Sequence, residues 1–123
     1  MKKRAAAAAF LSMTVLPTAA PHAGQPLRMQ VTPAIARAPA DLVVRVSVDA
    51  DAGDRLLRVV AESADFYRSS EISIDGERTP PLTVFEFRSL PSGVYQVTGV
   101  LVGVNGRRGI VSRLAKIEPP FGR

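Results

Sequence analysis

The 123-residue sequence has no cysteine and no tryptophan, and its single histidine is His22. The lack of cysteine excludes disulfides, covalently attached haem, thiolate metal sites and a lipid-modified N-terminal cysteine. The body of the chain therefore has no Ser–His–Asp or Cys–His group for nucleophilic catalysis. A copper site on a processed N-terminal His22 would lack a second histidine, so we expect no soft-metal site and no cofactor.

The sequence also has no apolar run of transmembrane length at its N-terminus. The uncharged stretch at residues 5–16 spans 12 residues, whereas a spanning helix needs about 20. It follows three basic residues at positions 2–4, a pattern typical of a secretory signal peptide. We expect residues 1–23 to be a leader, cut between positions 19 and 24. Residues 24–123 then form one domain, periplasmic or extracellular, with no membrane span.

Little net charge remains once the leader is set aside. The leader holds three of the 16 basic residues and none of the 11 acidic residues, which leaves 13 − 11 = +2. The remaining basic residues are scattered among the acids from Arg28 to Arg123. Nucleic-acid binding requires basic residues that cluster on one stripe or face. We therefore expect no nucleic-acid partner.

Apolar residues recur with a period of two, which indicates β-strands. In "DLVVRVSV" and "TVFEFRS" one alternating set is apolar and should face a core. The segment "RLLRVVAES" has apolar residues in both alternating sets, which predicts a central strand covered on both faces. The inward residues predicted from these three segments are Leu42, Val44, Val46 and Val48, then Leu57, Val59 and Ala61, then Phe85 and Phe87. The fold class is therefore all-β.

Five glycines lie between residues 87 and 109, but no helix or phosphate-loop spacing accompanies them. Asn105-Gly106 between two apolar runs instead predicts a type I′ hairpin turn. Pairing Val104 with Arg107 places Leu101 opposite Ile110. The core face then receives Tyr95, Val97, Leu101, Ile110 and Leu114, and the other face receives Val100, Val102, Val104 and Val111. A longer loop, "NGRRG", would shift this register.

The phrase "LPSGVYQV", from Leu90 to Val97, resembles a corner of immunoglobulin-like and fibronectin type III-like sandwiches. The longer pattern F-x-x-L-P-x-G-x-Y-x-V is similar to one in bacterial carboxypeptidase-regulatory-like domains. The resemblance implies a single immunoglobulin-like antiparallel β-sandwich of about seven strands, with Leu90, Gly93 and Tyr95 as a structural corner. The Tyr95 hydroxyl would then bond to a nearby backbone group. Val97 stands where antibody domains have cysteine, so the antibody-type core is absent.

One loop carries three carboxylates, Asp49, Asp51 and Asp54, beside Gly53. Hard cations such as Ca²⁺ prefer oxygen ligands of this kind. The spacing departs from the calcium-loop pattern, and Val60 stands where that loop has a bidentate glutamate. A polar turn explains the same residues, because Asp and Gly favour turns.

Two surfaces are candidates for binding. Val100, Val102, Val104 and Val111, joined by Phe121, would form an exposed apolar patch unless another strand or the tail covers them. Phe66, Tyr67 and Arg68 lie between predicted strands and would stack on a sugar or a peptide, unless they insert into the end of the core.

The sequence therefore predicts an exported binding or assembly module of the cell envelope, acting through an exposed sheet face. Its partner would be an envelope protein or a glycan, and self-association through the edge from Val100 to Val104 is included. The alternative is a carbohydrate-binding module that uses the loop aromatics. We expect the chain not to be an enzyme, because its scattered loop carboxylates give no close catalytic pair.

Overall fold

The computed structural model describes residues 26–121, so the predicted leader lies outside the described residues. Within this range no helix is both long and apolar enough to cross a membrane. The described chain contains eight strands and one short 3₁₀ helix, η1. The strands are β1 (Leu27–Thr32), β2 (Ile35–Arg37), β3 (Ala40–Val48), β4 (Asp54–Glu62), β5 (Tyr67–Ser73), β6 (Leu82–Leu90), β7 (Gly93–Gly103) and β8 (Gly106–Glu118), and η1 is Gly76–Arg78.

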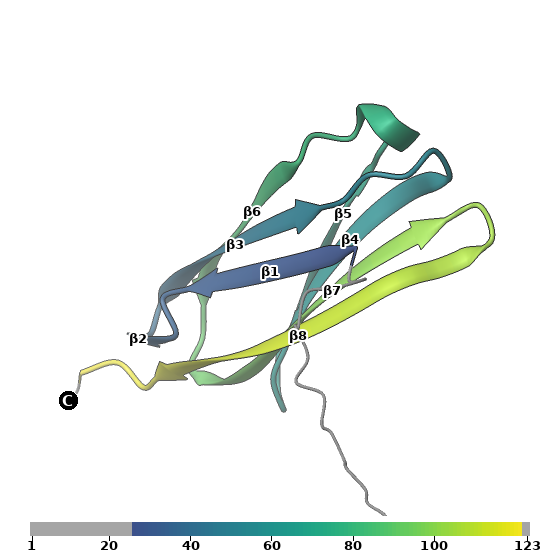
Figure 1. Ribbon diagram of the computed structural model, residues 1–123. Helices are drawn as coiled ribbons and strands as arrows, with labels where there is room; N and C mark the ends of the chain where they lie inside the picture. Colours follow the sequence, from purple (N-terminus) through teal and green to yellow (C-terminus); the bar gives the residue numbers. More distant parts are fainter. Residues whose placement is uncertain (1–25, 122–123) are drawn as a thin grey trace, which may run out of the picture.

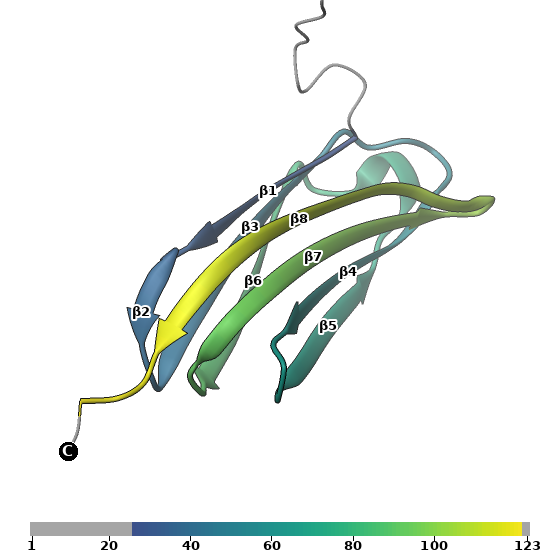
Figure 2. The ribbon, with the colours of Figure 1, turned by 90° about the horizontal axis from the view of Figure 1, so that it is seen from below.

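The strands form two sheets that face each other (Figures 1 and 2). The three-stranded sheet has the order β1-β3-β6, and the five-stranded sheet has the order β2-β8-β7-β4-β5. All pairs are antiparallel except β2 with β8. The chain changes sheets between β1 and β2, so the short β2 extends the five-stranded sheet beyond β8.

The inward faces of both sheets meet in one apolar core. Its largest fully buried side chains include Tyr95, Leu42, Leu57, Leu90 and Leu101. Burying a side chain of this size stabilises the fold by about 1.5–3 kcal/mol. All nine inward residues predicted for β3, β4 and β6 are buried in this core, so the period-two assignment is confirmed for those strands.

The predicted coverage of β4 on both faces is wrong. β4 does lie inside its sheet, between β7 and β5, with Leu57 and Val59 buried. The second apolar set of β4, which includes Leu56 and Val60, is only half-buried and faces solvent. Apolar residues in both alternating sets therefore reflect a central strand with one open face, not a second covering layer.

The hairpin between β7 and β8 forms where it was predicted, but its register differs. Gly103 pairs with Gly106, so Val104 and Asn105 form the turn. A type I′ turn needs a positive φ at both central residues. Among the described residues, Ser89 is the single non-glycine residue with a positive φ, so Asn105 does not adopt it. Gly106 takes the positive φ instead, at 113°.

A bulge at Arg108 completes the change of register. Val102 pairs with Arg107 and Leu101 pairs with Gly109, so Arg108 is the extra residue on β8. Continued to the end of β8, the predicted register would place Lys116 opposite Tyr95 on the core side. The observed register places Ala115 there and buries Ile117. The bulge thus avoids the high cost of burying an unpaired lysine.

The bulge exchanges several side chains between the two faces of β8. Ile110 and Leu114, predicted to face the core, are 50% and 68% exposed. Val111, predicted to face outward, packs against the core. Tyr95, Val97 and Leu101 on β7 are buried as predicted, so the error is confined to β8.

The corner before β7 has the bond that the resemblance implies. The Tyr95 hydroxyl donates to the Pro91 carbonyl oxygen at 2.8 Å, and the Tyr95 side chain is buried. Leu90 is also fully buried, and Gly93 starts β7 with a φ of 156°. On the β6 side, the Ser89 amide donates to Asp41 Oδ1 at 2.8 Å.

Candidate functional site

The solvent-facing side of the five-stranded sheet, here called the outer face, carries a contiguous apolar patch. Leu56 lies directly opposite Val102, and Val100 lies directly opposite Ile110. Val60 is a diagonal neighbour of Val100, because it pairs with Thr98. Directly paired residues have Cβ atoms about 4.5–5.5 Å apart, so these side chains touch. The apolar patch consists of Leu56, Val60, Val100, Val102 and Ile110.

Among the described residues, no element covers this patch. Ile110 is 50% exposed, and the other four residues are half-buried only by their neighbours in the sheet. Farther along the same face, Val94 and Leu114 are more than half exposed. The two valines predicted as a binding surface, Val100 and Val102, therefore lie at the centre of an open apolar surface.

The charges on the outer face are unevenly distributed. Arg58 lies inside the patch, opposite Val100 and between Leu56 and Val60 on β4, and its charge is neutralised by an ion pair with Glu71 of β5 at 3.1 Å. Arg107 lies opposite Val102, and Lys116 lies opposite Val94, so both lie on the outer face. Neither has an ion-pair partner within residues 26–121. Arg107 therefore makes the β8 border of the patch basic, whereas Lys116 lies farther along the same face.

The hairpin tip beside the patch is fixed by an ion pair between the buried Asp54 and the partly exposed Arg108. Arg108 Nε donates to Asp54 Oδ1 at 2.7 Å, and Asp54 is fully buried. A second guanidinium nitrogen reaches the Asp49 carbonyl oxygen at 3.1 Å. The hydrogen bond that Arg108 donates to Asp54 raises the pKa of Arg108 above its ordinary value. The Val104 amide also donates to the Gly53 carbonyl oxygen at 2.9 Å.

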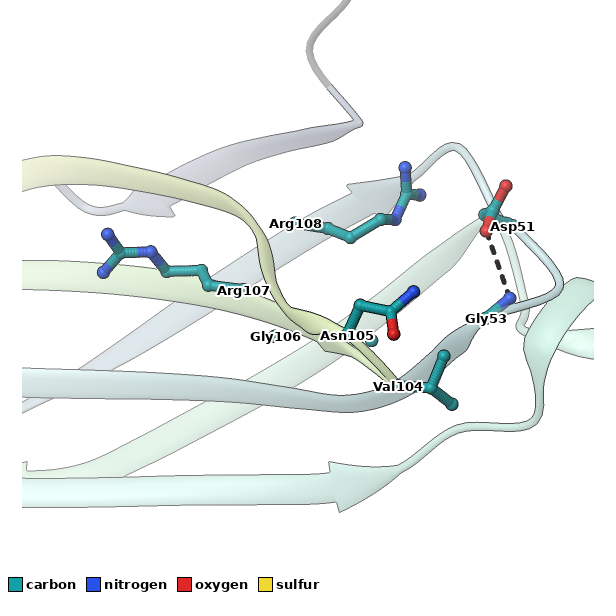
Figure 3. Close-up of a pocket in the computed structure, with 8 residues that line it drawn as sticks. Asp51, Gly53, Val104, Asn105, Gly106, Arg107 and Arg108 are labelled. Carbon is teal, nitrogen blue, oxygen red and sulfur yellow. Dashed lines mark hydrogen bonds between the residues drawn. The ribbon is translucent and has the colours of Figure 1, made fainter.

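A shallow pocket of about 130 Å³ lies between this tip and the loop before β4 (Figure 3). Arg108 points toward the loop that carries Asp51, whereas Arg107 points away from it. Val104 is 60% exposed at the tip, next to the apolar patch but outside the strand pairing. The predicted Val104 therefore extends the patch at its end and is not part of its centre.

The three aspartates of the loop have different roles. Asp54 holds Arg108 and also accepts the Asp51 amide at 2.9 Å. Asp51 Oδ2 accepts the Gly53 amide at 3.1 Å, and Asp49 pairs with Arg28 at 3.5 Å. Within the described range, no group of three or more His, Cys, Asp or Glu side chains is arranged to hold a metal ion. The carboxylates thus stabilise the turn and the hairpin tip.

The predicted aromatic group is divided between the core and the surface. Phe66 packs edge-on against Tyr95, with ring centroids 6.4 Å apart, and contacts the core. The Arg68 guanidinium lies 5.2 Å from the Phe66 ring centroid. Tyr67 pairs with Glu62 and is 60% exposed. Tyr67 therefore lies on the outer face, at the edge opposite the basic β8 side.

Sequence reasoning missed Ile110 and Leu56 as members of the patch and missed the Asp54–Arg108 pair. Leu56 was assigned to a covered face because β4 has apolar residues in both alternating sets. Ile110 was assigned to the core because the turn type was wrong. Lys116 could have revealed the wrong register, since that register places its charged side chain on the core side of the sheet.

No protein-family model matches the chain, and no curated protein matches its sequence. Solved structures share its fold. A superoxide reductase (neelaredoxin) from Ignicoccus hospitalis matches with a TM-score of 0.59 at 16% identity, over 75% of this chain and 80% of that one. A variant of that protein matches with a TM-score of 0.61 at 16% identity, over 80% and 85%.

A family 76 glycoside hydrolase from a bovine Bacteroides thetaiotaomicron strain also matches, with a TM-score of 0.54 at 17% identity. The match covers 76% of this chain but 20% of the hydrolase chain. At such low identity these likenesses establish the fold alone.

The comparison contradicts the prediction that the chain is not an enzyme. That prediction rested on the lack of a catalytic triad and of a close pair of carboxylates in the sequence. Superoxide reductases are enzymes with the same fold, so the fold gives no ground for excluding catalysis.

Proposed function

We propose that the chain is an exported immunoglobulin-like sandwich that binds a protein partner in the cell envelope through its outer face. The observation that carries this proposal is the contiguous apolar patch, which lies open to solvent at the centre of a sheet. Contiguous exposed apolar patches on soluble domains mark interaction sites. The antiparallel pairing and the Tyr95 corner support the immunoglobulin-like assignment.

The charges beside the patch indicate the chemistry of the partner. Arg107 lies beside the patch on β8, opposite Val102, whereas Arg58 within the patch is neutralised by Glu71. A fitting partner is an envelope protein that presents an apolar surface with acidic side chains along one side. Charge complementarity of this kind accelerates association and weakens as salt rises.

The test compares lysine substitutions on the solvent-facing sides of the two sheets. The mature domain with Val102→Lys should lose capture of the envelope partner, because a lysine would then lie in the patch. Gln30→Lys is the control, because Gln30 is exposed on β1 of the three-stranded sheet and belongs to neither the apolar patch nor the β6 edge. Capture should survive in this control and should weaken for the unmodified domain as salt is raised. Equal capture by the two variants would contradict the proposal.

The proposed export rests on residues 1–23 and has its own test. Cell fractionation after expression of the full sequence should place a shortened product outside the cytoplasm. An uncleaved cytoplasmic product would contradict export but would leave the apolar patch unaffected.

Glycan binding through a pair of loop aromatics has less support. Phe66 packs on Tyr95, so Tyr67 is the member of the predicted pair that is left to stack on a sugar. If a glycan is the ligand, Tyr67→Ala should abolish binding and Val102→Lys should not.

A further inference from the structure

The two sheets end in four edge strands, and these differ in how they resist pairing with another chain. Native edge strands are protected by shortness, proline or charged side chains. β2 has three residues and lies between Pro33 and Pro39, and β1 lies between Pro26 and Pro33. β5 carries Arg68, Glu71 and three serines in seven residues. These three edges are therefore protected.

β6 also lies between prolines, Pro81 and Pro91, but it is longer than the other three edge strands. It has nine residues with no proline and no lysine, and it keeps one register with β3 from Leu82 to Phe87. Its outward side chains begin with Leu82 and Val84, which are 50% and 54% exposed. The charges that follow, Glu86 and Arg88, pair with each other at 3.1 Å. The edge thus has no net charge to repel another strand.

The hydrogen bonds between β6 and β3 show which backbone N–H and C=O groups of β6 are unpaired. The Val48 amide donates to the Pro81 carbonyl oxygen, in the same register that pairs Ser47 with Leu82. In an antiparallel ladder, bonded and non-bonded pairs alternate along the strand. The odd-numbered residues of β6 therefore bond to β3. The N–H and C=O groups of Leu82, Val84 and Glu86 point away from β3 and remain free to pair.

We propose that β6 pairs antiparallel with β6 of a second copy, with the two-fold axis at Val84. The two three-stranded sheets then join into one six-stranded sheet. In this register Val84 lies opposite Val84 of the second copy as a direct apolar pair, and each Leu82 lies opposite Glu86 of the other copy. A register shifted by one residue per strand would instead place Val84 opposite Glu86 and Leu82 opposite Arg88.

The prolines before β6 are compatible with this register. Pro80 and Pro81 have no N–H to donate, so they must fall at the ends of the new ladder. With the axis at Val84, Pro80 lies opposite Arg88 of the second copy, outside the central pairs. A second copy of this chain fits this edge, because two identical β6 strands present Val84 and the same unpaired backbone groups to each other. This inference is independent of the partner proposed for the apolar patch.

A single cysteine tests the register directly, because the chain has no cysteine of its own. Residues that face each other in a bonded antiparallel pair have Cα atoms about 5.5 Å apart, which suits a disulfide. Val84→Cys should form a covalent dimer on mild oxidation. Leu82→Cys is the matched control: the two Leu82 positions would lie about 14 Å apart along the strands, too far for a disulfide. Equal cross-linking of both variants would overturn the proposed register.

Analytical ultracentrifugation over a concentration series tests the dimer itself. Val84→Pro removes an N–H that points away from β3, so the fold should remain, as circular dichroism would check. The dimer dissociation constant should rise about tenfold or more, because two symmetric hydrogen bonds are lost. Val102→Lys should leave it unchanged.

A monomer at every concentration would overturn the proposal, as would a dimer that Val102→Lys abolishes and Val84→Pro does not. If Val84→Pro fails to fold, the cysteine pair still decides. A variant that loses envelope capture but still dimerises would test the proposed function of the apolar patch and would leave the dimer proposal standing.

Discussion

The two ends of β7 are fixed by different kinds of interaction. At its start, the Tyr95 hydroxyl bonds to the Pro91 carbonyl oxygen, four residues away in the sequence. At its far end, the hairpin tip is held by Arg108 and the fully buried Asp54, 54 residues apart. The first contact is neutral and local, and the second is ionic and long-range.

This difference explains why one end could be predicted and the other could not. A local corner needs a short phrase of residues in the right order, so it is visible in one stretch of sequence. A bulge that turns Arg108 toward Asp54 depends on which strand lies beside β7. The Asn105-Gly106 pair locally favours a type I′ turn, but the long-range contact between Arg108 and Asp54 accompanies a different turn.

The largest expected effect tests which residues of β8 face the core. Ile117→Ala should destabilise the domain by about 3–4 kcal/mol, because Ile117 is buried and its truncation leaves a cavity. Ile110→Ala is the matched control and should cost less than about 1 kcal/mol, since half of Ile110 is already exposed. Urea denaturation measures both. A larger loss for Ile110 would favour the predicted register over the observed one.

The ionic end should respond strongly to loss of its cation. Arg108→Met should cost about 3 kcal/mol, because it leaves the Asp54 carboxylate buried without its partner. This is the low end of the usual range, since the Arg108 side chain is 32% exposed and water reaches it. Arg107→Met should change the free energy of unfolding by less than about 0.5 kcal/mol. Equal effects at the two positions would mean that the ion pair does not fix the hairpin.

The neutral end should respond less. Tyr95→Phe removes the hydroxyl that donates to Pro91 and should cost about 1–1.5 kcal/mol. Tyr67→Phe serves as the control, because Tyr67 is 60% exposed and its hydroxyl has no structural bond among the described residues. The same urea titrations measure the difference. A loss as large as that of Arg108→Met would remove the contrast between the two ends.

The smallest effect should come from the turn. Gly106 has a φ of 113°, which residues with a Cβ rarely adopt, although a Cβ there would touch nothing. Gly106→Ala should therefore cost about 1 kcal/mol through backbone strain alone. Gly53→Ala is the control, because its φ is not positive and a Cβ would make ordinary contacts. A neutral Gly106→Ala would show that the turn can relax.

Some of the fold could be predicted because its signals are repetitive and short-range. Phe85 and Phe87 alternate with Glu86 and Arg88, so just one assignment of faces buries the apolar set. On β8, by contrast, apolar residues occur in both alternating sets: Ile110 and Leu114 in one, Val111 and Ile117 in the other. Periodicity alone cannot choose between two such sets, so the assumed turn decided the assignment and was wrong.

The candidate site divides in the same way. Val100 and Val102 could be placed on one face because they lie on a strand with buried Val97 and Leu101. That Leu56 and Ile110 lie on either side of them depends on strand order and register. The separation of Phe66 from Tyr67 likewise depends on the position of the Tyr95 ring in the core.

The sequence by itself determined the strands β3, β4 and β6 with their inward residues, and the Tyr95 corner. These follow from alternation along the strand and from hydrogen bonds within a few residues. Tertiary structure alone decided the register of β8, the burial of Asp54 against Arg108, and the membership of the apolar patch. The physical reason is that a buried charge is stable only beside its ion-pair partner, and the register of a strand is set by the strands next to it. Folding brings these groups together from distant parts of the chain.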